Sequence, residues 1–117
     1  IAFGIDSKKI DDNLLKKVSK DSQLLDFVES LDDGFDTIVG ERGVKLSGGQ
    51  IQRIGIAREL YLKPELLVFD EATSALDQKT ELEFLDCLES LRRNKTIIFV
   101  SHRKSALKNC NKIKEVN

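Results

Sequence analysis

The stretch that decides the fold is Leu66-Leu67-Val68-Phe69-Asp70-Glu71. Its first four residues are apolar without polar alternation, which is typical of a strand covered on both faces in a parallel sheet. A second such run covers Thr96 to Val100. Between them we predict a helix that Asp77 caps, with an apolar stripe of Leu82, Leu85, Leu88 and Leu91. Strand, helix and strand in this order predict a βαβ unit, an α/β fold whose strands are parallel and adjacent or nearly so, with a right-handed crossover.

The residues before this unit predict helices. Leucine and valine recur at three- and four-residue spacing over 11–18 and 21–31, which predicts two short amphipathic helices. A loop rich in breakers then reaches about residue 46. Ser47 is the expected N-cap of a helix over about 48–62, with Ile51, Ile54, Ala57 and Tyr61 on one face and Pro64 after its end. After the second strand we expect a short helix near 105–110 and a possible strand over 112–116.

Composition limits the class of protein. The chain has 117 residues, 40% hydrophobic and 33% charged, with a formal net charge of -1. This balance predicts one folded unit or a piece of one, without the basic field expected for nucleic-acid binding. Its apolar runs are too short to cross a bilayer. Cys87 and Cys110 are isolated thiols, which favours a reducing, cytoplasmic setting. The chain has no Met and opens on Ile1, so we expect an excerpt of a longer reading frame.

Charged side chains follow both predicted strands. Asp70 and Glu71 come after the first strand and His102 after the second. Parallel strands end at the same edge of a sheet, where α/β proteins bind ligands, so these side chains are expected to converge. Adjacent carboxylates suit Mg²⁺ and the orientation or deprotonation of a water. Alternatively, the acidic pair only caps the next turn or helix, and His102 only bonds a backbone carbonyl.

A glycine pair opens the helix that starts near 48. Leu46-Ser47-Gly48-Gly49-Gln50 combines a hydroxyl, a backbone open to close approach and the free amides of a helix start, which together attract an anion such as phosphate. The simpler alternative is a Gly-Gly turn before a capped helix. The pattern G-x-x-x-x-G-K-[ST] does not occur, so the chain holds at most part of a phosphate site.

Three ordered motifs then resemble one family. LSGGQ at 46–50, LLVFDEATSALD at 66–77 and Ser101-His102-Arg103 resemble the signature, Walker B with D-loop, and switch histidine of ABC-transporter ATPase domains. TIVGERG at 37–43 is similar to the exporter-type segment beside the coupling helices. The resemblance implies the C-terminal part of a P-loop NTPase core, with parallel strands and flanking helices, over 47–117. It implies a partial α-helical subdomain over 1–46.

The resemblance also implies roles for individual residues. Asp70 would hold Mg²⁺ through water, Glu71 would be the catalytic base, and His102 would contact the γ-phosphate of ATP. The signature residues would contact the ATP held by the opposite subunit, and the D-loop would cross that interface. The residues concerned are Ser47, Gly48, Gly49 and Gln50 for the signature, and Ser74, Ala75 and Asp77 for the D-loop.

The function implied is that of a fragment of the cytoplasmic ATP-binding domain of an ABC exporter. Its parent would hydrolyse ATP to move a lipid, glycolipid, peptide or drug. ATP and Mg²⁺ are expected only in the complete head-to-tail dimer of two such domains, which would act on a transmembrane domain of the same transporter and not on nucleic acid. The segment itself is expected to be soluble, at the cytoplasmic face of the membrane. Without the phosphate-gripping loop, the isolated chain is expected to be inactive.

Two alternatives remain at this point. A soluble ABC-type ATPase acting on DNA or the ribosome shares these motifs, but TIVGERG and the absence of long coiled-coil heptads argue against it. A non-catalytic interaction module could keep the fold alone. The presence of both Glu71 and His102 argues against such a loss of function.

Overall fold

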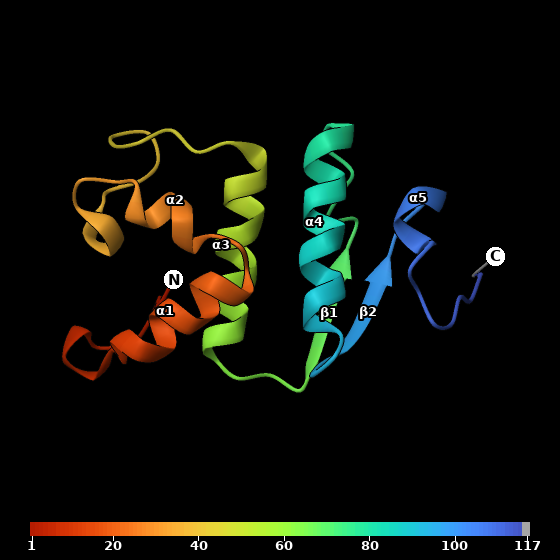
Figure 1. Ribbon diagram of the computed structural model, residues 1–117, viewed down its shortest axis with the longest axis horizontal. Coiled ribbons are helices and arrows are strands. Elements are labelled where there is room, and N and C mark those ends of the chain that lie inside the picture. Colours follow the sequence, from red (N-terminus) through yellow and green to blue (C-terminus); the bar gives the residue numbers. More distant parts are fainter. Residues whose placement is uncertain (116–117) are drawn as a thin grey trace. The chain divides into compact units, whose positions relative to one another are not determined.

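The computed structural model describes residues 1–115, without the side chain of Ser105. The chain divides into two compact units, Ile1–Pro64 and Glu65–Asn117 (Figure 1), and each is described by itself. The predicted domain boundary at 46/47 is based on the position of the sequence motifs, whereas the boundary between the compact units is based on contacts. The motif-based boundary stays a prediction. Within the described part of the chain, no helix is both long and apolar enough to cross a membrane.

The first unit is helical. Its elements are the 3-10 turns η1 (Ser7–Lys9) and η2 (Gly34–Asp36) and the helices α1 (Asp12–Asp21), α2 (Leu25–Glu29) and α3 (Gly48–Tyr61). The helices α1 and α3 pack against each other. Asp11 caps α1 through its carboxylate, while its own backbone N–H donates a 2.8 Å hydrogen bond to the hydroxyl of Tyr61 at the end of α3. The start of α1 is thereby fixed to the end of α3.

The first two helices differ from the predicted ranges. We predicted helices over 11–18 and 21–31, but α1 continues to Asp21 and α2 has only five residues. The cause is local. Ser22 ends α1, and Gln23 adopts a left-handed φ of 54°, which breaks the helical path before Leu24. The prediction was therefore wrong about the boundary and right about the presence of two helices.

The helix α3 matches its predicted range, but its buried face is shifted. Lys63, with φ of 54°, and then Pro64 end it as expected. Ile51 was predicted on the buried face but is 58% exposed. The contacts of α3 with α1 and with the turn after α1 begin further along the helix. Arg53 donates to the carbonyl of Gln23, and Tyr61 accepts from the amide of Asp11. The buried residues are Ile56, Ala57, Leu60 and Tyr61.

The loop before α3 folds back on itself. Val39 and Val44 form an isolated β-bridge, and the Val44 amide donates a 3.0 Å hydrogen bond to the carbonyl of Ile38. Gly43 lies inside this turn, where a Cβ would come 1.9 Å from the Ile38 carbonyl oxygen. The backbone is thus too close for any side chain at position 43.

Replacing Gly43 by Ala should open this loop. The displaced backbone should cost about 1–3 kcal/mol, as overpacking does, and the Val44 amide should exchange its hydrogen faster because its bond to Ile38 lengthens. Gly55→Ala is the matched control, since a Cβ there meets nothing within 4 Å inside α3, and it should stabilise by about 0.5–1 kcal/mol. Unchanged exchange at Val44 in Gly43→Ala, measured by NMR, would contradict the crowding.

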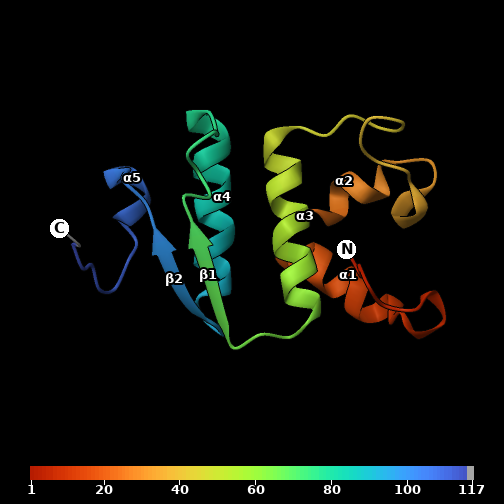
Figure 2. The same cartoon turned by 180° about the vertical axis from the view of Figure 1, so that it is seen from behind.

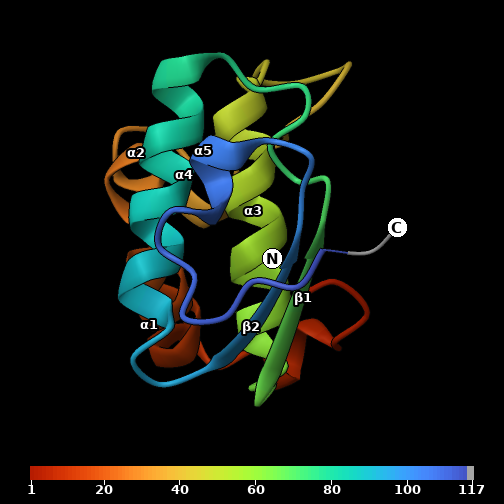
Figure 3. The same ribbon diagram turned by 90° about the vertical axis from the view of Figure 1, so that its right-hand side faces the viewer.

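The second unit is the predicted βαβ unit. It contains β1 (Leu66–Asp70), α4 (Gln78–Leu91), β2 (Thr96–Val100) and α5 (Lys104–Leu107). The strands are parallel and directly paired, from Leu66 opposite Thr96 to Asp70 opposite Val100 (Figures 2 and 3). Asp77 caps α4, as predicted, and accepts hydrogen bonds from the Lys79 and Thr80 amides.

Within the described residues of the second unit, the sheet is covered on one face only, so the prediction of strands buried on both faces was wrong. Alternate residues Leu66, Val68, Ile98 and Val100 are between 47% and 60% exposed. The other face carries Phe69 and Phe99, which meet Phe84 of α4 with ring centroids 5.7 and 6.5 Å away. Within the described residues of the second unit, α4 packs on this face of the two-stranded sheet.

The buried stripe of α4 and the end of the chain also differ from prediction. Leu82 was placed in the stripe but is 55% exposed, and Leu85 is half-buried, because the helix turns Phe84 toward the aromatic contacts. Its buried residues are Glu81, Phe84, Cys87, Leu88 and Leu91. The short helix falls at Lys104–Leu107 and not at 105–110. Residues 112–115 form no strand, and Val116 lies outside the described residues.

Candidate functional site

The predicted site residues fall in both units, so each group is considered within its own unit. The signature residues 47–50 belong to the first unit, and the acidic pair, the D-loop and His102 belong to the second. In the second unit, Asp70 is the last residue of β1, and the other predicted residues occupy the two loops that follow β1 and β2.

Glu71 follows β1 with an unusual backbone. Its amide donates a 2.9 Å hydrogen bond to the carbonyl of Val100, which extends the sheet ladder by one rung. Its φ of 50° is left-handed, a conformation that costs a residue with a side chain roughly 1–3 kcal/mol. The strand therefore ends abruptly at this residue, and its side chain leaves the alternation of β1.

The side chains of Glu71 and His102 meet. The His102 Nε2 atom lies 3.4 Å from the Glu71 Oε1 atom, in an ion-pair contact when the imidazole is protonated. The Glu71 Oε1 atom is buried and has no hydrogen-bond partner in the structure, whereas the His102 side chain is 96% exposed. Of the three side chains predicted to converge at this sheet edge, those of Glu71 and His102 are in contact, and the Glu71 Oε1 atom keeps an unused capacity to accept a hydrogen bond.

Asp70 provides a second carboxylate at this edge. It is the last residue of β1, lies opposite Val100 and is exposed to solvent. The described residues contain no group of three or more acidic, histidine or cysteine side chains that could hold a metal by themselves. The carboxylates of Asp70 and Glu71 fit Mg²⁺, because this ion commonly takes one or two carboxylates and completes its shell with phosphate oxygens and water.

The segment from Thr73 to Asp77 links Glu71 to α4. Thr73 and Leu76 are buried, while Ser74 and Asp77 are exposed. The Ser74 amide donates to the Glu71 carbonyl at 3.0 Å. Hydrogen bonds from the Thr80 hydroxyl and amide lower the pKa of Asp77 from its usual value. Asp77 is therefore an ionised helix cap, which confirms the structural role predicted for it.

Arg103 makes contacts that the sequence did not indicate. Its guanidinium donates to the Ser74 carbonyl at 3.1 Å and to the Glu81 carboxylate at 2.9 Å. A longer contact of 3.4 Å reaches the Leu76 carbonyl. In the sequence, the single indication of these contacts is that Arg103 directly follows His102. Its hydrogen-bond partners lie 22 to 29 positions earlier, so no local pattern predicts them.

The signature residues form a capped helix start. The Ser47 hydroxyl accepts a hydrogen bond from the Gln50 amide, and the Gln50 side chain accepts one from the Ser47 amide at 2.8 Å. This reciprocal capping box is the simpler of the two interpretations given for this motif. Ser47 and Gly48 are nevertheless exposed, and Gly49 is half-buried. The start of α3 thus keeps the first amides of a helix accessible to an anion.

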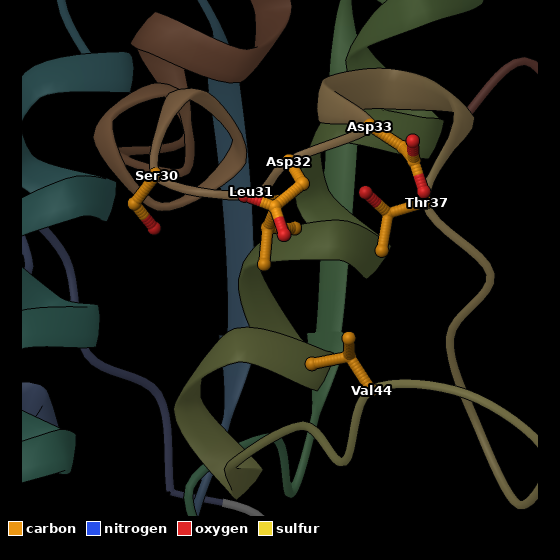
Figure 4. Close-up of a pocket in the computed structure, with 6 residues that line it drawn as sticks. All are labelled: Ser30, Leu31, Asp32, Asp33, Thr37 and Val44. Carbon is orange, nitrogen blue, oxygen red and sulfur yellow. The ribbon is translucent and has the colours of Figure 1, made fainter.

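A separate pocket lies in the first unit. Its volume is about 190 Å³, and it holds none of the predicted site residues. Figure 4 shows its lining. Ser30, which follows α2, lies on one side, and Val44 of the folded-back loop lies apart from the other residues. The buried hydroxyl of Thr37 has no hydrogen-bond partner there. The lining consists of Ser30, Leu31, Asp32, Asp33, Thr37 and Val44.

Comparison with known sequences agrees with these motifs. The sequence profile of the ABC transporter family matches residues 4–74. The chain is 45% identical over 97% of its length to ABC transporter B family member 16 of Arabidopsis thaliana, and 47% identical over 93% to the ABC multidrug transporter mdr1 of Aspergillus fumigatus. It is 46% identical over 97% to the ATP-dependent lipid A-core flippase of Desulfotalea psychrophila.

A solved structure agrees as well. The structure of a bacterial Atm1-family ABC exporter with ATP bound superposes with a TM-score of 0.72 and 41% sequence identity, over 92% of this chain and 19% of that one. Fold and site together define part of an ABC-type ATPase core of the P-loop NTPase class. The chain belongs to the ABC transporter family. It spans between 8% and 19% of the length of the three relatives named above.

Proposed function

We propose that the chain is part of the cytoplasmic ATP-binding domain of an ABC exporter, and that its parent couples ATP hydrolysis to transport. The observation that carries the proposal is the contact between the Glu71 carboxylate and the His102 imidazole at the carboxyl edge of the sheet, 3.4 Å apart. Relatives named as a multidrug transporter and a flippase support the transport role. We expect a transmembrane domain and a second ATP-binding domain as its partners.

The roles proposed for the second unit follow from its chemistry. The Glu71 carboxylate would orient a water and accept its proton as the water oxygen bonds to the γ-phosphorus and the bond to ADP breaks, which gives ADP and phosphate. The exposed imidazole of His102 would contact the γ-phosphate. Asp70 would hold Mg²⁺, which neutralises phosphate charge when bound. Positioning and charge supply most of the catalysis in phosphoryl transfer.

The signature residues would act on a second nucleotide. The exposed start of α3 supplies accessible amides, Gly48 lets an anion approach the backbone, and the Ser47 hydroxyl already fixes the helix cap. We propose that Ser47, Gly48, Gly49 and Gln50 contact the γ-phosphate of ATP held by the opposite domain. Ser74 and Asp77, both exposed in the D-loop, would lie at the same dimer interface.

Two substitutions of Ser47 test the phosphate contact separately from the cap. Asn and Asp are both good N-caps, so Ser47→Asn and Ser47→Asp should leave thermal stability nearly unchanged. Only Asp adds a negative charge where the anion would bind. We expect Ser47→Asp to weaken ATP-driven dimerisation of the parent's ATP-binding domains by at least about tenfold relative to Ser47→Asn, measured by analytical ultracentrifugation with ATP and Mg²⁺.

The same design identifies the structural alternative. If Ser47 only caps α3, the two variants should dimerise equally well at equal stability. Asp11→Asn serves as a control for cap chemistry, because the Asp11 carboxylate caps α1 by accepting hydrogen bonds from the Asn13 and Leu14 amides. It should leave ATP-driven dimerisation unchanged.

A further inference from the structure

The guanidinium of Arg103 joins the two loops that carry the proposed catalytic pair. One nitrogen, Nη2, donates to the Ser74 carbonyl at 3.1 Å, and the other, Nη1, donates to the Glu81 carboxylate at 2.9 Å. Ser74 belongs to the loop that begins at Glu71, and Arg103 belongs to the loop that carries His102. The contact therefore spans the gap between the segment after β1 and the segment after β2.

The His102 side chain depends on such support. It is 96% exposed, so packing does not fix its position. Its imidazole lies 3.4 Å from the Glu71 carboxylate, in an ion-pair contact when the imidazole is protonated. The loop around it is held by Arg103, whose amide donates to the Ser101 hydroxyl at 3.0 Å and whose side chain reaches the D-loop and α4. The place of the imidazole thus depends on where Arg103 holds the backbone.

The anchor of this contact is a buried helix residue. Glu81 lies in the middle of the first turns of α4, and its side chain is only 7% exposed, whereas that of Arg103 is 39% exposed. A buried carboxylate is strongly favoured to keep a cationic partner. The planar fork of an arginine holds two acceptors in a fixed geometry, which the point charge of a lysine does not.

We infer that Arg103 is a positioning residue for ATP hydrolysis, which ties the His102 loop to the D-loop and α4 so that His102 and Glu71 stay in contact. The inference rests on the proposed function, because it assigns Arg103 a part in the reaction proposed for this site. It predicts that removing the guanidinium lowers the rate of turnover more than it lowers the affinity for ATP. It also predicts that the effect passes through His102.

Steady-state hydrolysis by the full-length parent protein tests the inference. Arg103→Ala should lower kcat by about 10- to 100-fold, as small misplacements of reacting groups do, with KM for ATP nearly unchanged. Arg103→Lys should recover only part of the loss. The matched control is Arg92→Ala, because Arg92 also ties α4 to the segment after α5, through Glu89 and the Asn109 carbonyl, but far along the helix from the site. It should hydrolyse ATP like the wild type.

A double-mutant comparison separates positioning from general support. In a His102→Ala background, Arg103→Ala should add little further loss, because the group it positions is gone. Equal kcat values for Arg103→Ala and Arg92→Ala would overturn the inference, and so would a full, additive loss in the His102→Ala background. If Arg103→Ala does not fold, Glu81→Gln and Arg103→Lys carry the same comparison. Full hydrolysis by Glu71→Gln would instead overturn the proposed function.

Discussion

Replacing Glu71 by Gln should lower ATP hydrolysis by the full-length parent about 10²- to 10⁴-fold, the usual contribution of a general base. The amide has nearly the shape of the carboxylate but does not accept the proton of an attacking water. ATP binding should be retained, because the substitution removes a negative charge and adds no bulk. Phosphate release measures hydrolysis, and equilibrium binding of labelled ATP measures affinity.

The structure explains why this substitution should not disturb the fold. The Glu71 Oε1 atom is buried without a hydrogen-bond partner, and the amide that extends the sheet to Val100 belongs to the backbone. Melting temperature should therefore stay within a few degrees of wild type. Glu89→Gln is the matched control, since Glu89 forms an exposed pair with Arg92 on α4, and it should hydrolyse ATP normally. A kcat for Glu71→Gln close to that of Glu89→Gln would remove Glu71 from the role of base.

The largest effect on stability is expected at Phe84. This side chain is 2% exposed and stands edge-on to Phe69, with ring planes at 89°, while its other neighbour is Phe99 of β2. Truncation to Ala removes the α4 ring that packs against both Phe69 and Phe99. We expect Phe84→Ala to lower the free energy of unfolding by about 3–5 kcal/mol, a large share of the 5–15 kcal/mol typical of a domain.

Leu82 on the same helix is the control for this experiment. It is 55% exposed, so Leu82→Ala should change the free energy of unfolding by less than about 0.5 kcal/mol. Calorimetry on both variants gives the comparison. A cost at Leu82 similar to that at Phe84 would mean that the helix face predicted from leucine spacing is the buried one.

Local chemistry made much of this fold predictable. The apolar runs at 66–69 and 96–100 form the two parallel strands, and the side chains of Ser47 and Asp77 cap helices as their types and positions predicted. Convergence of Glu71 and His102 followed from strand direction alone. These features depend on neighbours in sequence or on the rules for parallel sheets.

What the sequence did not predict depends on distant partners. Leucines at 82, 85, 88 and 91 suggested one face of α4, but Phe84 turns toward two strand phenylalanines, and Glu81 is buried where Arg103 reaches it. The left-handed φ of Glu71 is equally non-local, since its amide is held by Val100 of the other strand. The open face of the sheet was missed because an apolar run indicates that a strand can be covered, and not that the chain supplies the cover.

The fluorescence of Tyr61, which is hydrogen-bonded to Asp11, can report on the unfolding of the first unit. The sequence has no tryptophan and a single tyrosine, so near-ultraviolet emission comes almost entirely from this phenol. Tyr61 is 6% exposed, and its hydroxyl receives the Asp11 amide, both inside Ile1–Pro64. Loss of that environment on denaturation should change the tyrosine emission, whereas Glu65–Asn117 contains no tyrosine or tryptophan to contribute to it. The emission can therefore follow one half of the polypeptide without any engineered label.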